Sequence, residues 1–302
     1  MEALDPSTPS SSSSSKPPNP FPPTLSPLPP SVSRLWRPAA QRNLRNQWSK
    51  LAALTQQWSS SSSAGRSHAT SLVNSYLSQK YMPSMELGVL SDMPNIRKKA
   101  CWKLAKQQEL HRRNLLASYK DMVGVVVQMV QTSKSMRCYL KGTSSALVQF
   151  SASSEDKNDP GDGGGITVFT FFSISTIEKY AEELVQMSTL ELNLKRLLVV
   201  ELLSISCESS MISRINWSDE LYPGEFDDLS ICNLFSEEIG EPVHPRLHVS
   251  KSDLPTTECN QQPNQETLQV YLTTWLAEVN IDTHRVDEIF ATIGEEMHVK
   301  LT

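Results

Sequence analysis

The spacing of apolar residues between positions 115 and 140 is the strongest pattern in the chain. Apolar side chains recur there at alternating intervals of four and three residues, and Ser133 is the single polar member of the series. A repeat of 3.5 residues held over more than three heptads is typical of the contact line between paired helices. We therefore predict one long helix from about residue 95 to 140, ended by Gly142, with a coiled-coil seam along it. The seam consists of Leu115, Tyr119, Met122, Val126, Met129, Ser133, Met136 and Leu140.

A second apolar pattern precedes this helix. It predicts a helix over residues 38–57, followed by a serine-rich segment, 59–67, that is expected to interrupt it. The apolar face of this helix is formed by Leu44, Trp48, Leu51, Leu54 and Trp58.

Two shorter elements follow the long helix. Residues 167–172 read TVFTFF, which is β-prone and aromatic, and they predict either one strand or an extended strap across the helices. Ser175 and Glu178 then have the spacing of a capping box, in which serine and glutamate satisfy free amides at a helix start. The apolar residues after them predict a helix that ends near Cys207.

The C-terminal part shows the same periodicity on a smaller scale. Asn264 is a good N-cap residue, and the segment TLQVYLTTWLAEV at 267–279 places one apolar stripe on a helix. Because a helix of this length is marginal alone in water, we expect the stripe to pack on the helix at 177–205. Residues 280–283 predict a turn into a final short helix. The residues expected to hold this C-terminal part together are Leu268, Leu272, Trp275 and Val279.

These elements predict a mainly α fold: an elongated helical bundle or coiled coil with long helices. Its low-complexity segments predict a disordered tail and an acidic disordered insertion. The expected organisation is a Ser/Pro-rich tail at 1–33, a basic helix and the heptad helix at 34–142, a flexible linker at 143–165, a strap and amphipathic helix at 166–207, the insertion at 208–263, and a helical pair at 264–302.

Charge is distributed unevenly along the chain. The formal net charge is −5, so no overall positive field attracts nucleic acid. No Asp or Glu occurs in residues 6–85, whereas residues 217–260 hold ten acidic side chains against Arg246 and Lys251. This segregation is typical of an interaction protein and unusual for an enzyme surface.

No arrangement of residues predicts catalysis. The five cysteines have no C-x-x-C spacing and are interpreted as free thiols. His244 and His248 are four residues apart, but Pro245 between them prevents the helix on which such a pair binds zinc. The chain also lacks phosphate-binding and nucleophile motifs. We predict that it is not an enzyme and that it binds no metal or cofactor.

One basic stretch allows a second interpretation. Residues 96–113 carry a single acidic residue, Glu109, and an aromatic residue, Trp102, that is able to stack on a base. The stretch therefore predicts either a phosphate-binding helix or a helix that meets an acidic protein surface. Its basic residues are Arg97, Lys98, Lys99, Lys103, Lys106, Arg112 and Arg113.

The order of these features resembles the cyclin-dependent kinase 2-interacting protein family, of which this chain looks like a longer, plant-like member. The specific part of the resemblance is FFSISTIEKYAEELVQMSTLELNLKRLLVVELLS at 171–204 together with residues 266–297. The resemblance implies a non-catalytic adaptor. It further implies links to cyclin-dependent kinases, replication and checkpoint proteins, a small coiled-coil partner, and AAA+ ATPases that act in replisome turnover and ribosomal-subunit maturation.

The adaptor hypothesis assigns partner contacts to the seam and to two charged residues in the helix at 177–207. These residues are Leu115, Tyr119, Met122, Val126, Met129, Lys195 and Arg196. Two alternatives remain: a nucleic-acid-binding helical protein that uses residues 97–113, and a structural coiled coil of a spindle or tethering assembly. Membrane association is not expected. The expected location is nuclear, with the cytoplasm as a second site, although the arginines at 34–45 without acidic residues also resemble an organellar transit peptide.

Overall fold

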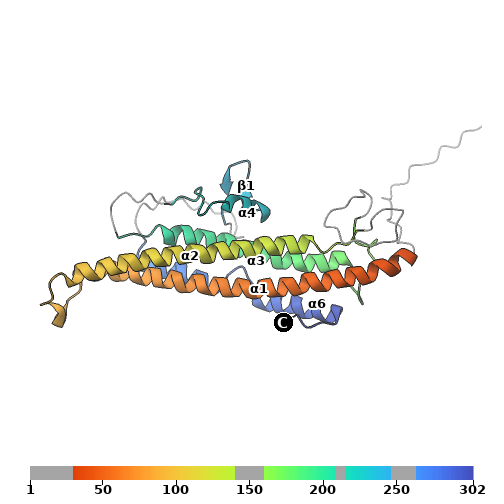
Figure 1. Cartoon of the computed structure of the whole chain (residues 1–302), viewed down its shortest axis with the longest axis horizontal. Coiled ribbons are helices and arrows are strands. Elements are labelled where there is room, and N and C mark those ends of the chain that lie inside the picture. The colour runs from red at the N-terminus through yellow and green to blue at the C-terminus, as the bar shows by residue number, and fades with distance from the viewer. Residues whose placement is uncertain (1–29, 140–159, 208–214, 246–262, 302) are drawn as a thin grey trace, which may run out of the picture.

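The computed structural model confirms a mainly α fold and describes residues 30–139, 160–207, 215–245 and 263–301. Figure 1 shows long helices lying side by side along one axis, with the C-terminal helices against one flank and a small protrusion on the other. The elements are α1 (Pro30–Tyr81), the 3₁₀ turns η1 (Met82–Ser84) and η2 (Gly88–Leu90), α2 (Ile96–Lys134), α3 (Ile174–Leu203), α4 (Glu225–Ile231), β1 (Phe235–Ser236), β2 (Glu241–Pro242), α5 (Gln265–Ala277) and α6 (Thr283–Met297).

Helix α1 is one continuous helix of 52 residues, so the predicted interruption at 59–67 is wrong. At 1.5 Å per residue it is about 78 Å long. The serines do not break it because the buried face continues through them with small side chains at Ser62, Gly65 and Ala69. The buried residues of α1 are Trp36, Ala40, Leu44, Trp48, Leu51, Leu54, Trp58, Ser62, Gly65, Ala69, Leu72, Val73, Ser75 and Tyr76.

Helix α2 runs antiparallel to α1 and ends at Lys134, earlier than the predicted end at residue 140. The chain then leaves the helix because polar groups of α1 bind its carbonyls. Asn43 Nδ2 donates to the Ser135 and Met136 carbonyls, at 2.9 and 3.1 Å, and Trp36 Nε1 donates to the Cys138 carbonyl at 3.0 Å. The predicted terminator, Gly142, lies outside the described residues.

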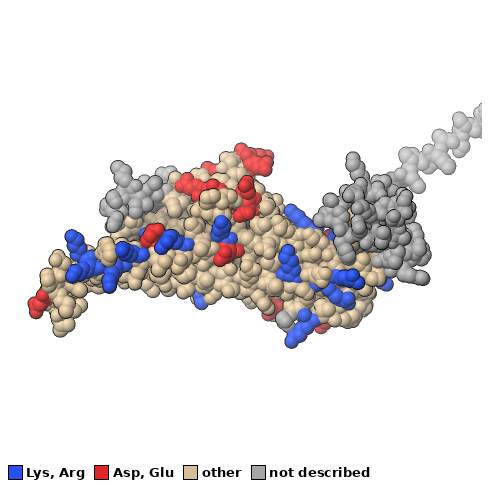
Figure 2. Space-filling model, in the orientation of Figure 1, with Lys and Arg blue, Asp and Glu red and all other residues tan. Residues whose placement is uncertain are grey.

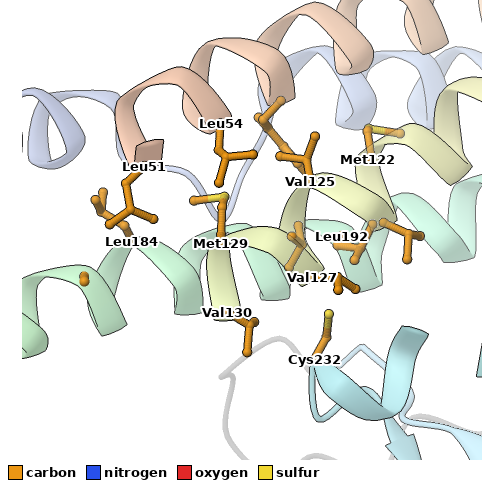
Figure 3. Close-up of a cluster of buried hydrophobic side chains, with 14 of the residues drawn as sticks. Leu51, Leu54, Met122, Val125, Val127, Met129, Val130, Leu184, Leu192 and Cys232 are labelled. Carbon is orange, nitrogen blue, oxygen red and sulfur yellow. The ribbon is translucent and has the colours of Figure 1, made fainter. Parts of the chain in front are cut away.

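The centre of the bundle is formed by three helices that converge on α2. Figure 3 shows leucines of α1 and α3 around Met129 and Val125 of α2, while Cys232, which follows α4, points toward the opposite side of α2. Met122, Val123 and all residues from Val125 to Val130 except Gln128 are buried. Helix α2 is therefore the central helix of the bundle and buries more than one face.

A strap of residues 160–173 crosses the helices before α3 begins. Gly163 has φ +70°, and a Cβ there would lie 2.3 Å from the ring of Trp36, so this position requires glycine. Further along, Glu296 Oε1 accepts hydrogen bonds from the amides of residues 170–172, at 2.9, 2.8 and 2.8 Å. The expected strap is thus confirmed, and part of the expected linker, 160–165, belongs to it.

Helix α3 starts two residues before the predicted capping box. Its N-cap is Ser173, whose hydroxyl accepts from the Thr176 amide, whereas Ser175 lies inside the helix. Glu178 does not reach back to the helix start, because Arg137 binds it with two hydrogen bonds, at 2.8 and 2.9 Å.

Residues 215–245 fold onto the bundle, which corrects the prediction of disorder for this part of 208–263. Tyr222, Leu229, Cys232 and Leu234 are buried there. The segment forms α4 and a two-stranded antiparallel pair in which Phe235 lies opposite Pro242. Residues 208–214 and 246–262 lie outside the described part of the chain.

The C-terminal pair, α5 and α6, forms largely as predicted. Asn264 Oδ1 accepts from the Thr267 amide at 2.7 Å, and Asp282 caps α6 in the same way. Leu268 and Trp275 are buried and Leu272 packs against the core. Val279 is exposed because α5 ends at Ala277, so its expected structural role is wrong.

Trp275 packs on α1, which the sequence pattern did not predict as the cover for α5. Its Nε1 donates to the Ser62 carbonyl at 3.0 Å, and a Cβ added at Gly65 would lie 2.7 Å from the indole Cζ2. Helix α3, the predicted cover, supplies Lys195, which donates to the Trp275 carbonyl. The indole therefore lies between α1 and α3, in a notch made by the small residues of α1.

A pair of matched glycine substitutions tests this notch. Gly65→Ala is expected to destabilise the fold, because overpacking costs about 1–3 kcal/mol and exceeds the roughly 1 kcal/mol that alanine gains over glycine in a helix. Gly124→Ala in α2 meets nothing within 4 Å and is expected to stabilise by up to about 1 kcal/mol. Urea unfolding measures both. A gain for both variants would contradict the notch.

Candidate partner-binding surface

The structure buries the predicted seam inside the chain. Leu115, Tyr119, Met122 and Val126 have no exposed surface, and Met129 is 1% exposed. The expectation that these residues contact a partner is corrected, because they are buried where α1, α3 and the α4 segment of the same chain pack on α2. The heptad pattern correctly indicates a helix–helix contact line, but the paired helices belong to one molecule.

Lys195 is also buried, and it binds the end of α5. Its ammonium lies 3.1 Å from Glu191 and 3.9 Å from Glu278, and 4.8 Å from the centre of the Trp275 ring. Burial lowers the pKa of Lys195, and the Glu191 carboxylate opposes that shift. This residue therefore ties α3 to α5, and its predicted partner contact is wrong.

Arg196 points to another side of α3 and holds the α4 segment. It binds Glu225 at 2.8 Å, and it donates to the carbonyls of Trp217 and Asp219, at 2.8 and 2.9 Å. Tyr119 of the seam donates to the same carboxylate at 2.7 Å. Burial raises the pKa of Tyr119, and the neighbouring Glu225 charge raises it further.

The signal for these clusters was present in the sequence. Two adjacent cations inside ELNLKRLLVVELL, at 191–203, interrupt an otherwise apolar helix. Buried charges persist only when they are paired, so such cations indicate acidic partners elsewhere in the fold. The sequence did not show where the partners lie, because Glu225 belongs to a segment whose composition predicts disorder.

Half of the exposed large apolar residues in the described part of the chain lie at one end of the molecule. Helix α3 ends at Leu203, and the residues that follow it reach Arg112, which donates to the Ile205 carbonyl. Helix α2 before this point, the turns η1 and η2, and the last turn of α1 extend beyond α3, as the left end of Figure 1 shows. We call residues 77–113 the hairpin end. Its exposed large apolar residues are Tyr81, Met85, Val89, Leu90, Met93, Trp102 and Leu110.

Basic residues cover the same end. Arg97, Lys98, Lys99, Lys103, Lys106 and Arg113 are exposed, whereas Arg112 is partly buried against Ile205. Lys99, Lys103, Lys106 and Arg113 lie on the side of α2 away from α1, because the face that meets α1 carries Gln108 and Leu115. Figure 2 shows the blue side chains over this end and red side chains over the α4 protrusion.

The interior of the hairpin end is fixed by a polar contact. Gln108 is buried, and its amide donates to the Ser75 carbonyl at 3.3 Å and to Gln79 Oε1 at 2.5 Å. Both acceptors belong to α1. A buried amide that is satisfied in this way sets the register of the two helices, so the exposed residues sit on an ordered scaffold.

The other features of note in the described part of the chain are a groove and a pair of histidines. A groove of about 1020 Å³ lies between α1 and α6, lined by residues such as Ala52, Phe290 and Leu301. Within the described ranges, no three His, Cys, Asp or Glu side chains are grouped closely enough to bind a metal ion. The rings of His68 and His111 lie with their centres 6.1 Å apart and tilted by 34°, and burial together with His68 lowers the pKa of His111.

The comparisons with known proteins give no relative: no family model matches this chain, and no curated protein is similar to it. Among the described helices, none is both long enough and apolar enough to span a membrane.

Because Arg196 and Glu225 are buried as a pair, we expect replacement of Arg196 to destabilise the fold strongly. Arg196→Met is expected to cost about 3–5 kcal/mol, because it leaves Glu225 buried without its cation. Arg285→Met is the matched control: that arginine binds Glu183 at 2.6 Å but both side chains are a third or more exposed, so a much smaller loss is expected. Urea unfolding gives the free energies, and hydrogen exchange should show the added opening of Arg196→Met in residues 215–245. Equal losses in the two variants would contradict the assignment.

The raised pKa of Tyr119 predicts that the stability of the fold depends on pH. This pKa is raised in the folded chain, whereas an unfolded tyrosine ionises near 10.0. Above about pH 10 the unfolded chain therefore loses a proton that the folded chain keeps, so stability is complete below that pH and falls as the pH rises. Tyr119→Phe should remove part of this fall. The lowered pKa of Lys195 acts in the opposite direction, so the wild type and the variant are compared at each pH by urea unfolding. Parallel pH curves would contradict the prediction.

Proposed function

We propose that this chain is a non-catalytic adaptor that binds protein partners through the hairpin end. Following the family resemblance, its partners are a small coiled-coil protein and an AAA+ ATPase of the unfoldase type. Its work then belongs to DNA replication, cell-cycle and DNA-damage checkpoint control, and ribosomal-subunit maturation, mainly in the nucleus. Cyclin-dependent kinases and replication factors are further partners implied by the same resemblance.

The observation that carries the proposal is the exposed apolar surface of the hairpin end. Val89 is 94% exposed, and Met85, Met93 and Trp102 are each about half exposed on the same ordered hairpin. Apolar side chains that gather on one exposed surface commonly mark a protein interaction site. The flexible methionines among them suit contact with a shaped partner surface.

The buried charged clusters support a binding role over a catalytic one. Lys195 and Arg196 both bind acceptors that hold α5 and the α4 segment in place. A group that is fully engaged in joining elements of the fold has no free position for a substrate. The chemistry available at the exposed surfaces is recognition by apolar contact and charge.

The nucleic-acid alternative retains one favourable observation, since the basic side chains of residues 97–113 other than Arg112 are exposed. The structural coiled-coil alternative loses its basis, because the seam that suggested it is covered within the chain.

Affinity purification of the tagged full-length chain from its own cells, followed by mass spectrometry, tests the proposal. The wild type should recover an AAA+ ATPase together with a small coiled-coil protein. The variant Val89→Asp/Met93→Asp should recover at least fivefold less of both. Val270→Asp/Leu276→Asp is the matched control, because these residues are similarly exposed but lie on α5. Circular dichroism confirms that each variant is folded.

Absence of both proteins from the wild-type purification would overturn the proposed function. Equal recovery by the two variants would overturn the assignment of the binding surface to the hairpin end.

A further inference from the structure

The outward face of α2 carries a regular row of basic and apolar residues. Its members are separated by four, three, four and three residues, which is the spacing that keeps one line of a helix facing a second helix. The row extends for about 21 Å at 1.5 Å per residue. Its members are Lys99, Lys103, Lys106, Leu110 and Arg113, all exposed, and we call it the outer row.

Two large apolar side chains accompany the cations. Leu110 lies within the outer row and is 45% exposed, and Trp102 lies beside it and is 58% exposed. The Lys106 ammonium lies 3.9 Å above the Trp102 ring, so one face of the indole is already occupied by a cation. The row therefore offers both apolar surface and positive charge to whatever binds it.

The cations of the outer row have no acidic partner within the described part of the chain. The nearby carboxylate, Glu109, pairs with Arg112, at 3.7 Å, and Arg112 lies outside the row. The acidic α4 segment meets α2 further along, where Lys120 lies over the Tyr222 ring at 4.9 Å and Tyr119 binds Glu225. The described acidic segment thus leaves the outer row uncovered.

We propose that the outer row binds an acidic amphipathic helix of a partner protein; this inference rests on the proposed adaptor function. A helix whose facing line carries Asp or Glu opposite Lys99, Lys103 and Lys106 would neutralise these cations. Apolar residues in the same helix would cover Leu110 and Trp102. Such a partner matches both properties of the row, charge and apolar surface.

Nucleic acid matches only one of these properties. A phosphate backbone would use the cations but gains nothing from exposed Leu110, and the carboxylate of Glu109 lies among the same turns. Base stacking on Trp102 is restricted to one face by Lys106. The combination of charges and aliphatic surface therefore favours a protein helix.

Fluorescence anisotropy with the full-length chain and three labelled probes tests the inference. The first probe is a stapled 21-residue helix with glutamates and leucines in one line at alternating intervals of four and three residues. The second is a scrambled peptide of the same composition without that line, and the third is a 20-nucleotide single strand. The amphipathic helix is expected to bind at least tenfold tighter than either of the others, and its affinity should fall as salt is raised from about 50 to 300 mM.

Two variants and their matched controls identify the surface. Lys103→Glu/Lys106→Glu and Trp102→Ser/Leu110→Ser should each weaken binding of the amphipathic helix at least tenfold. The controls are Lys50→Glu/Lys179→Glu and Val270→Ser/Leu276→Ser, which change exposed residues of the same types on α1, α3 and α5. These should stay within twofold of the wild type.

Equal binding of the amphipathic and scrambled peptides would overturn the inference, as would tighter binding of the oligonucleotide or no binding of any probe. The outcome is separable from that of the proposed function. If the AAA+ ATPase is recovered but the peptide does not bind, the adaptor function stands and the inference fails. If the peptide binds but no AAA+ ATPase is recovered, the inference stands and the proposed partners are wrong.

Discussion

The fold depends on the burial of α2 on more than one face. The segment from Met122 to Val130 carries apolar side chains in several directions, and an isolated helix with such a surface is not stable in water. Helix α1 covers one side, α3 another, and the α4 segment reaches a third through Cys232. Every other element is then placed by what it covers: α5 and α6 lie against α1 and α3, and the strap is held by Glu296 of α6. The long helices are thus held by tertiary packing, and their intrinsic helix propensity is secondary.

One turn of α3 joins two otherwise separate parts of the molecule. Lys195 and Arg196 are neighbours in sequence, but successive residues on a helix point about 100° apart, so one reaches α5 and the other reaches α4. Each cation is buried together with a glutamate, which makes the loss of one partner costly and the pair itself close to neutral in stability. These clusters therefore set which segments dock on α3, while the apolar core supplies most of the stability.

The sequence predicts the helices well where the apolar pattern is strong and poorly where the buried residues are small or the covering segment is acidic. The seam, the Asn264 cap and the C-terminal helices follow directly from periodicity. The interruption predicted at 59–67 is wrong because Ser62, Gly65 and Ala69 are too small or too polar to continue the apolar pattern. These residues nevertheless form the surface on which Trp275 packs. The disorder predicted for 215–245 is wrong because acidic residues usually lie in solvent, whereas Glu225 is buried and paired with Arg196. The location of the exposed hairpin end could not be predicted, since it depends on where α3 stops.

The unbroken length of α1 has a mechanical consequence. The hairpin end and the groove beside α6 are both built on this helix, and no hinge in the described chain separates them. Two molecules bound at these two places would therefore be held at a fixed distance from each other and at a fixed rotational angle about α1. Inserting or deleting a single residue between them would turn one site by about 100° relative to the other and move it by about 1.5 Å. The serine-rich stretch of α1 thus forms a rigid spacer between the hairpin end and the groove.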